Sequence, residues 1–145
     1  MSEEIKSKFL RVVDEAWNKG NLVALDELHA PDYIEHHSPF PDVKGLDTFR
    51  QMVANARKTY PDFHITIHEL ILEGNTLAVR WSWTGTHLEE TQQLSIPPTG
   101  KRVTLTGSHI LHVGGDKLIE GWQFADDLGL MQQLGLTPQP GAQEA

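Results

Sequence analysis

The chain has 145 residues, with 20 acidic and 12 basic side chains, a formal net charge of −8 and no cysteine. This length fits one domain with a core of its own. The acidic residues are scattered and the largest basic group is Lys101-Arg102, which argues against nucleic acids and anionic membranes as partners. The lack of cysteine excludes disulfides, a thiolate nucleophile and cysteine-bound metals.

The N-terminus starts acidic and lacks the apolar stretch of a signal peptide. No apolar run reaches the length that a membrane-spanning helix needs. We therefore expect a cytoplasmic protein without membrane contact. Because there is no cysteine, the sequence leaves the redox state of the compartment open.

Residues 3–17 have the pattern of an amphipathic helix. Its apolar residues recur at spacings of three and four, with charged residues between them: Ile5, Phe9, Val12, Val13, Ala16 and Trp17. Gly20 predicts the end of this helix, because glycine is a common C-terminal cap.

Two shorter segments follow the first helix. A helix is expected at 22–28 and is ended by Pro31, after which 33–41 is expected to be an extended piece that runs into a loop. Helical spacing returns at 47–59 and stops at Pro61.

After the third helix the hydrophobic period changes to two, which is typical of strands. Residues 63–72 and 76–84 predict a hairpin around the turn Gly74-Asn75. Counting back from this turn pairs Glu69 with Arg80, His68 with Trp81, and Thr66 with Trp83. Glu69 and Arg80 are expected to form an ion pair across the strands.

A second hairpin is predicted from 101–113 and 117–125, around Gly115-Asp116. Its register is expected to pair Gly114 with Lys117, Leu111 with Glu120, and His109 with Trp122. Helices followed by antiparallel strands indicate an α+β domain, with the helices packed on one face of a bent sheet. We expect one domain over 1–136, ending in a short helical or looping segment, and a disordered tail at 137–145.

Strict alternation in the last strand puts five side chains on one face: Leu118, Glu120, Trp122, Phe124 and Asp126. The predicted register adds His109 to this face. If the face lines a closed pocket, its apolar wall raises the pKa of a carboxylate toward the range useful for acid-base catalysis. Asp126 is therefore the first catalytic candidate. The alternative for Asp126 is an N-cap of the segment that begins at Leu128, although Asp127 is favoured for that position.

Several motifs carry a resemblance to a known family: Trp17-Asn-Lys-Gly20-Asn21, Pro31-Asp-Tyr33-Ile-Glu-His36, Gly85-Thr86-His87, Pro97-Pro98-Thr99-Gly100, and Glu120-x-Trp122-x-x-x-Asp126-x-x-Gly129-Leu130-x-x-Gln133-Leu134-Gly135. Over residues 3–136 the chain resembles the SnoaL-like polyketide cyclases of the nuclear transport factor 2-like superfamily. The resemblance implies a cone-shaped α+β barrel whose curved sheet and helices enclose one deep pocket. It also implies a homodimer formed through the sheet.

The resemblance further implies an intramolecular aldol condensation that closes a ring of a polyketide ester without a cofactor. One aspartate acts as the acid-base group, and it corresponds to Asp126. A histidine near the pocket mouth corresponds to His36, for which a loop histidine bonded to the backbone is the slightly favoured alternative.

The other candidates for the site are assigned by their place on the predicted face. His109 either shares protons with Asp126, or binds a substrate carbonyl, or is a buried histidine that pairs with a neighbour. Glu120 is either a second acid or the partner of a cation, for which Arg80 is a candidate. The aromatic residues are expected to contact substrate, with core packing as the alternative: Trp17, Trp122 and Phe124.

The eight histidines do not predict a metal site. On an extended strand His64 and His68 lie about 13 Å apart, which is too far to share one ion. His109 and His112 point to opposite faces. We expect neither a metal nor another cofactor.

The sequence therefore predicts an aldol-type cyclase, or related acid-base chemistry, on a hydrophobic carbonyl-containing small molecule. A non-catalytic protein that binds such a molecule is the alternative. An epoxide hydrolase on the same fold is less favoured, because Ser82 stands where the Arg-x-Asp motif that begins at Arg80 needs a carboxylate. A ketosteroid-isomerase-like isomerase lacks its first-helix tyrosine, since Trp17 fills that stretch.

Overall fold

The computed structural model describes residues 2–91 and 94–136. Its elements follow in the order α1 (Ser2–Val13), η1 (Asp14–Asn18), η2 (Leu22–Ala24), α2 (Leu25–Leu28), β1 (His29–His36), β2 (Val43–Lys44), α3 (Leu46–Thr59), β3 (His64–Glu73), β4 (Thr76–Thr86), β5 (Arg102–Gly114), β6 (Lys117–Ala125) and α4 (Asp127–Gln133). The expected tail at 137–145 lies outside the described residues. No helix of the described part is long and apolar enough to span a membrane.

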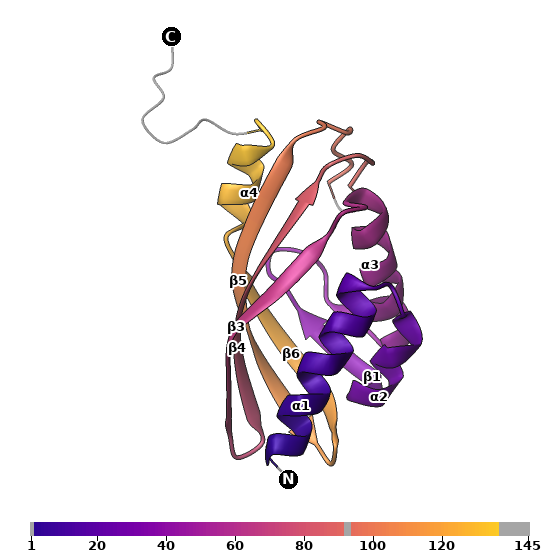
Figure 1. Ribbon diagram of the computed structural model, residues 1–145, viewed down its shortest axis with the longest axis vertical. Coiled ribbons are helices and arrows are strands. Elements are labelled where there is room, and N and C mark those ends of the chain that lie inside the picture. The colour runs from indigo at the N-terminus through magenta and orange to yellow at the C-terminus, as the bar shows by residue number, and fades with distance from the viewer. Residues whose placement is uncertain (1, 92–93, 137–145) are drawn as a thin grey trace.

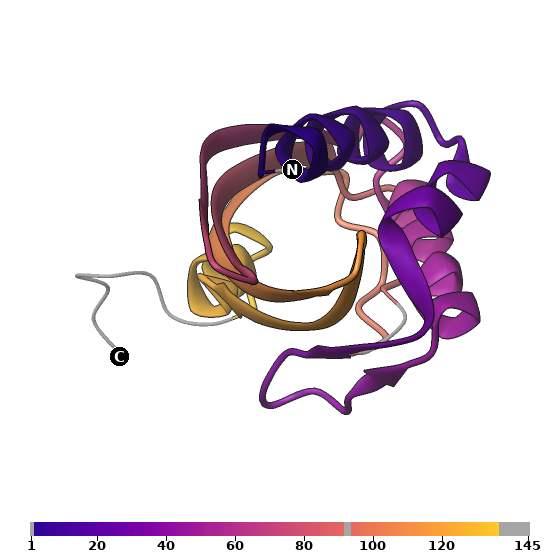
Figure 2. The same ribbon diagram turned by 90° about the horizontal axis from the view of Figure 1, so that it is seen from below.

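The six strands form one mixed sheet in the order β2-β1-β6-β5-β4-β3. Only β1 and β6 pair in parallel, and every other neighbouring pair is antiparallel. The sheet curves strongly but does not close, and helices cover its concave side (Figure 1, Figure 2). The predicted α+β architecture with N-terminal helices on a curved sheet is confirmed.

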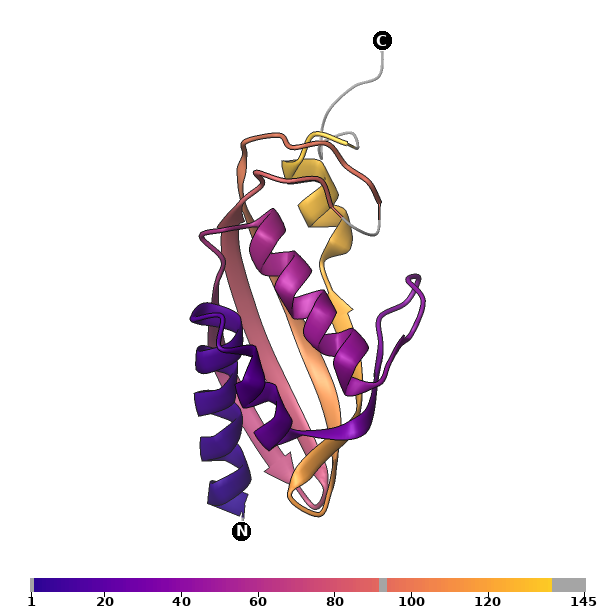
Figure 3. The ribbon, with the colours of Figure 1, turned by 90° about the vertical axis from the view of Figure 1, so that its right-hand side faces the viewer.

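Helices α1 and α3 lie in front of the sheet in Figure 3, where α1 contacts β3 and α3 contacts β1. The predicted apolar stripe of the first helix is buried against the sheet, with Val12 fully covered. After η1 the chain turns at Gly20, whose φ of 80° suits glycine. Arg57 of α3 donates to the backbone carbonyls of Trp17 and Asn18, at 2.6 and 3.1 Å, and so satisfies two carbonyls at this helix end.

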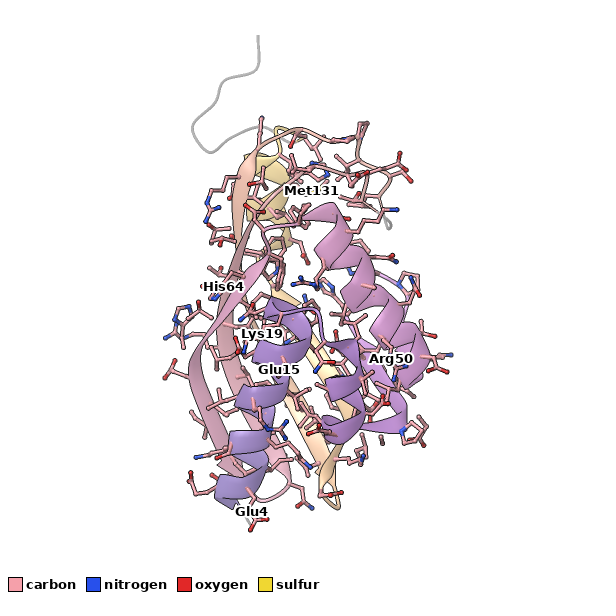
Figure 4. The ribbon with its side chains drawn as sticks, turned by 45° about the vertical axis from the view of Figure 1, so that its right-hand side comes forward. Glu4, Glu15, Lys19, Arg50, His64 and Met131 are labelled. Atoms are coloured by element: carbon pink, nitrogen blue, oxygen red, sulfur yellow. The ribbon has the colours of Figure 1, made fainter. Side chains whose placement is uncertain are left out.

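The surface of the helices is charged and paired. Glu15 and Lys19 lie side by side at the end of η1, with 3.3 Å between the carboxylate and the ammonium group (Figure 4). Pairs of this kind in water contribute little to stability. The helices are therefore held mainly by the apolar faces that they turn toward the sheet.

The first hairpin begins in the predicted register and then shifts by one residue. Glu69 pairs with Arg80, and the expected ion pair is confirmed with 2.6 Å between Arg80 Nε and Glu69 Oε1. A bulge between Ile67 and Glu69 then pairs Ile67 with Trp81 and Ile65 with Trp83. The predicted pairs of His68 with Trp81 and Thr66 with Trp83 are wrong for this reason.

The second hairpin shows the same behaviour, with larger consequences. Gly114 pairs with Lys117 as predicted, but an irregularity at Ile119 brings His112 opposite Glu120. The predicted partners Trp122 for His109 and Glu120 for Leu111 are therefore wrong. Beyond Ile119, each side chain of β6 points to the face opposite to the predicted one. Gly121 and Gln123 therefore face the helices.

The shift at Ile119 sends three predicted site residues to the convex side of the sheet: Glu120, Trp122 and Phe124. Phe124 is 60% exposed, whereas Gly121 is buried. The face that was expected to line a pocket is therefore the outer face of the sheet.

Glycines at two strand positions make room for large side chains on the concave side. Gly121 of β6 lies between Tyr33 and Leu111: a Cβ atom here would clash with the Tyr33 hydroxyl and lie 2.6 Å from Leu111 Cδ2. Gly107 of β5 pairs with Trp81, and a Cβ atom there would lie 2.7 Å from the indole ring. Both glycines mark close approaches across the sheet.

We predict that Gly121→Ala lowers the free energy of unfolding by about 1–3 kcal/mol, because the added methyl group overpacks a fully buried site. The measurement is urea unfolding at equilibrium. Gly114→Ala is the control, since its Cβ would meet only the exposed side chain of Ile119. Equal stability of the Gly121 variant and the parent would contradict the close approach.

His29 is a buried histidine at the start of β1, 5% exposed. Its Nδ1–H donates to the backbone carbonyl of Leu25 at 3.1 Å, and its ring lies against Tyr33 and Phe49 at 4.7 and 4.9 Å between centroids. Burial lowers the pKa of His29 to about 4 from an ordinary value of 6.5. This effect of burial is larger than the opposite effects of the bond to Leu25 and of the attraction by Glu35. The folded protein therefore keeps His29 neutral.

Because the unfolded chain binds a proton at His29 before the folded protein does, stability should fall as pH falls from about 6.5 to 4. The loss assigned to His29 is about 3 kcal/mol. We predict that His29→Gln removes this part of the pH dependence and that exposed His64→Gln does not, as measured by urea unfolding at several pH values. Parallel curves for the parent and His29→Gln would show that His29 titrates normally.

Candidate functional site

A cavity of about 700 Å³ lies between the helices and the concave face of the sheet. This volume is within the range of small-molecule sites. Its walls are mostly apolar and aromatic, with contributions from every layer of the fold: Phe9, Val12, Leu25, Phe63, Trp83 and Leu130. Figure 4 places Met131, another lining residue, at the end of the molecule opposite Glu4.

Four polar side chains from three neighbouring strands gather on the sheet wall of this cavity. Tyr33 and Glu35 alternate along β1, Gln123 comes from β6, and His109 comes from β5. Glu35 is beside Gly121, and Gln123 is opposite His109. Glu35 of β1 reaches across β6 to His109 of β5, and Gly121 between them leaves room for the Tyr33 hydroxyl.

Hydrogen bonds join this cluster into one network. Trp81 donates its indole N–H to His109 Nδ1 at 2.9 Å, and His109 Nε2 lies 3.1 Å from Glu35 Oε1. Tyr33 donates its hydroxyl to the same oxygen of Glu35 at 2.9 Å. Glu35 is 3% exposed and Tyr33 is fully buried.

The surroundings of Glu35 favour its charged form. Burial acts to raise the pKa of Glu35, but the interactions with His109 and Tyr33 outweigh burial and leave this pKa below its ordinary value. Burial and the neighbouring Glu35 raise the pKa of Tyr33 well above its ordinary value, so Tyr33 remains a donor. Oε2 of Glu35 has no hydrogen-bond partner among the described residues, and Glu35 lines the cavity.

A second histidine–carboxylate pair also lines the cavity. His37 follows β1, and its Nε2 lies 2.8 Å from Oδ2 of Asp127, the first residue of α4. The ring of Phe40 packs on His37 with 5.0 Å between centroids. Nδ1 of His37 has no hydrogen-bond partner in the described part of the chain, so this nitrogen is available to a ligand.

Asp126, the first catalytic candidate, caps α4. Its Oδ1 accepts the backbone N–H of Gly129 at 2.9 Å, and the residue is exposed. The alternative of a capping role for Asp126 is thus the one seen, and the preference for Asp127 as the cap is wrong. Asp127 lines the cavity and Asp126 does not. A catalytic role for Asp126 stays a prediction.

His36 and its neighbours form a separate group on the outer face. His36 Nε2 lies 2.7 Å from Glu120 and Nδ1 lies 2.9 Å from Asp42; these bonds, to Glu120 first, raise the pKa of His36. The ring stacks on Trp122 at 5.3 Å. His36, Trp122 and Phe124 line a small depression of about 230 Å³.

Two other predicted residues lie apart from that group. The suggested pairing of Glu120 with Arg80 is wrong, because Arg80 binds Glu69 and Glu120 binds His36. Trp17 does line the main cavity, with its ring 5.4 Å from that of Phe63. No group of three or more histidine or acidic residues in the described ranges is arranged to hold a metal ion.

Sequence reasoning missed Tyr33, Glu35 and Trp81 as site residues. The stretch that holds Tyr33 and Glu35 was predicted to be an extended piece that runs into a loop, and nothing in that prediction assigned these two side chains to a site. His109 was predicted to share a pocket face with Trp122 and Asp126, but it lines the cavity without them. Only the pairing of β1 with β6 brings Glu35 within reach of His109.

Solved structures with this fold come from several bacteria. A proposed SnoaL-like polyketide cyclase from Jannaschia sp. CCS1 matches with a TM-score of 0.83 and 21% identity, over 94% of each chain. TsrD from Streptomyces laurentii matches with a TM-score of 0.79 and 27% identity, over 94% of this chain and 96% of that one. At 21% identity the first match shows the fold alone.

A proposed polyketide cyclase from Acidithiobacillus ferrooxidans matches with a TM-score of 0.76 and 28% identity, over 90% of this chain and 94% of that one. None of the curated proteins matches the chain in sequence. The model of the family described as SnoaL-like polyketide cyclase matches residues 7–134. Because this match spans most of the chain, the protein belongs to the SnoaL-like polyketide cyclase family.

Proposed function

We propose that the protein binds an apolar, carbonyl-containing small molecule in the cavity and transfers a proton at a carbon next to the carbonyl, as an aldol-type cyclase does. One observation carries this proposal: the Glu35 carboxylate is held by two donors on Oε1, while Oε2 has no partner among the described residues and Glu35 lines a mostly apolar cavity. A carboxylate in this arrangement is a candidate general base.

Each polar group on the sheet wall has a role in this scheme. Glu35 Oε2 takes a proton from the carbon, and the electron pair of the C–H bond becomes an enolate. The amide of Gln123, beside His109, donates to the enolate oxygen. The enolate carbon then attacks a second carbonyl of the same molecule, which forms the new C–C bond and an alkoxide.

The alkoxide needs a proton, and the pair of His37 with Asp127 supplies it in this scheme. Asp127 stabilises the protonated ring, and His37 gives the proton from Nδ1 to the alkoxide. The proton on Glu35 returns to His37 through solvent, so the reaction is a net isomerisation. Holding both carbonyls of one molecule in a near-attack shape supplies much of the rate.

The lowered pKa of Glu35 restricts the substrate. A weakly basic carboxylate removes only protons that are already acidified, since the rate of proton transfer follows the driving force. We therefore expect a substrate carbon that lies between two carbonyls or between a carbonyl and an aromatic ring.

The experiment is proton exchange in D2O with 2-tetralone, an apolar ketone with one acidified benzylic position, followed by proton NMR. The parent should exchange this position faster than buffer does, and Glu35→Gln should lower the enzymatic rate at least about 100-fold, because it removes the general base. Asp126→Asn is the matched control and should exchange at the parental rate.

Loss of exchange in Asp126→Asn with retention in Glu35→Gln would contradict the proposal and favour Asp126 as the base. Tryptophan fluorescence reports binding separately, because Trp17, Trp81 and Trp83 line the cavity. A parent that binds 2-tetralone without exchanging its protons would favour the non-catalytic binding protein.

A further inference from the structure

Trp81 is the last residue in the chain of hydrogen bonds that runs from Glu35 through His109. It lies on β4, is 4% exposed and donates to His109 Nδ1 on β5. Its ring is 5.8 Å from the imidazole ring between centroids. Gly107 opposite Trp81 leaves space for the indole to lie over β5, because any Cβ atom at this position would meet the ring.

The chemistry of the indole group fixes the protonation of His109. An indole N–H is only a donor, so His109 Nδ1 must accept and cannot carry a hydrogen. In a neutral imidazole the hydrogen is then on Nε2, which lies 3.1 Å from Glu35 Oε1. An imidazolium ion would place an N–H at Nδ1 against the indole N–H, with two donors facing each other.

We propose that Trp81 is a positioning residue for Glu35: it holds His109 as a neutral Nε2–H donor and prevents His109 from taking the proton that Glu35 is to receive. The catalytic meaning of this inference rests on the proposed function, but the tautomer of His109 does not. Without the indole N–H, His109 can become an imidazolium ion beside Glu35. A full positive charge there would stabilise the carboxylate and weaken it as a base.

The groups around His109 are consistent with this role. From β1, Glu35 accepts from Nε2 and Tyr33 donates to the same oxygen of Glu35. His29, also on β1, interacts electrostatically with both Glu35 and His109, and its pKa of about 4 keeps it neutral at neutral pH. Tyr33 is neutral as well, since its pKa is raised. Burial raises the pKa of Glu35 and the interaction with His109 lowers it most among these neighbours, so the protonation of His109 bears most directly on this carboxylate.

The test is long-range proton–nitrogen NMR of the full chain labelled with ¹⁵N-histidine, recorded without ligand at several pH values. In the parent we expect His109 to show an unprotonated Nδ1 and a protonated Nε2 at neutral pH, because the indole N–H faces Nδ1. A protonated Nδ1 in the parent at neutral pH would overturn the inference. This spectrum needs no variant, so it decides the tautomer even where a variant fails to fold.

Trp81→Phe removes the N–H and keeps an aromatic ring on the wall. We expect Nδ1 of His109 to gain a proton in this variant, because no donor faces this nitrogen once the indole N–H is removed. Trp83→Phe is the matched control: Trp83 lies on the same strand and lines the same cavity, but packs against Tyr60 and Phe63 instead. An unchanged His109 in Trp81→Phe would overturn the inference.

The rate of 2-tetralone exchange completes the test. It should fall about tenfold or more in Trp81→Phe, because Glu35 becomes a weaker base, and stay near the parental rate in Trp122→Phe, because Trp122 stacks on His36 on the outer face of the sheet. Equal rates in both variants, with a changed His109, would overturn the positioning role. If the parent shows the expected tautomer but Glu35→Gln exchanges normally, then the proposed function fails and the assignment of the tautomer stands.

Discussion

The buried charge of Glu35 is the constraint on which the rest of the site depends. A carboxylate at 3% exposure is stable only where hydrogen bonds replace water. Tyr33 lies on the same strand as Glu35, but His109 lies two strands away, beyond β6. The network also needs Gly121 on the intervening strand, because a side chain there would clash with the Tyr33 hydroxyl that donates to Glu35. The hydrogen bonds that keep Glu35 charged in the cavity thus depend on which residues the neighbouring strands carry.

The fold and the chemistry are connected less tightly than the family match suggests. A structure with 21% identity shares the fold with a TM-score of 0.83, and folds of this kind are reused for different reactions. The cavity wall of this chain carries two histidine–carboxylate pairs, Glu35 with His109 and Asp127 with His37. In the first pair, Trp81 occupies the second ring nitrogen of His109, and one oxygen of Glu35 has no partner among the described residues. In the second pair, Nδ1 of His37 has no partner among them.

The sequence predicts the elements well and the faces of the strands poorly. Turn residues such as Gly74-Asn75 and Gly115-Asp116 give the correct register next to each hairpin loop. The shifts at His68 and Ile119 leave no mark in the sequence, because both residues suit a regular strand. One such shift moves every later side chain to the other face. Glu35 escaped prediction for another reason: its partner comes from a strand 74 residues later, and only tertiary pairing brings them together.

The most direct measurement is a crystal structure with 2-naphthol, a phenol that resembles the enol of 2-tetralone. The account predicts that the rings lie in the apolar cavity beside Trp83 and Phe63, with the hydroxyl group within hydrogen-bond distance of the Gln123 amide and the adjacent ring carbon C1 facing Glu35 Oε2. A naphthol bound in the depression beside Trp122, or one whose hydroxyl group contacts Asp126, would contradict the claim that Glu35 is the reactive centre of this protein.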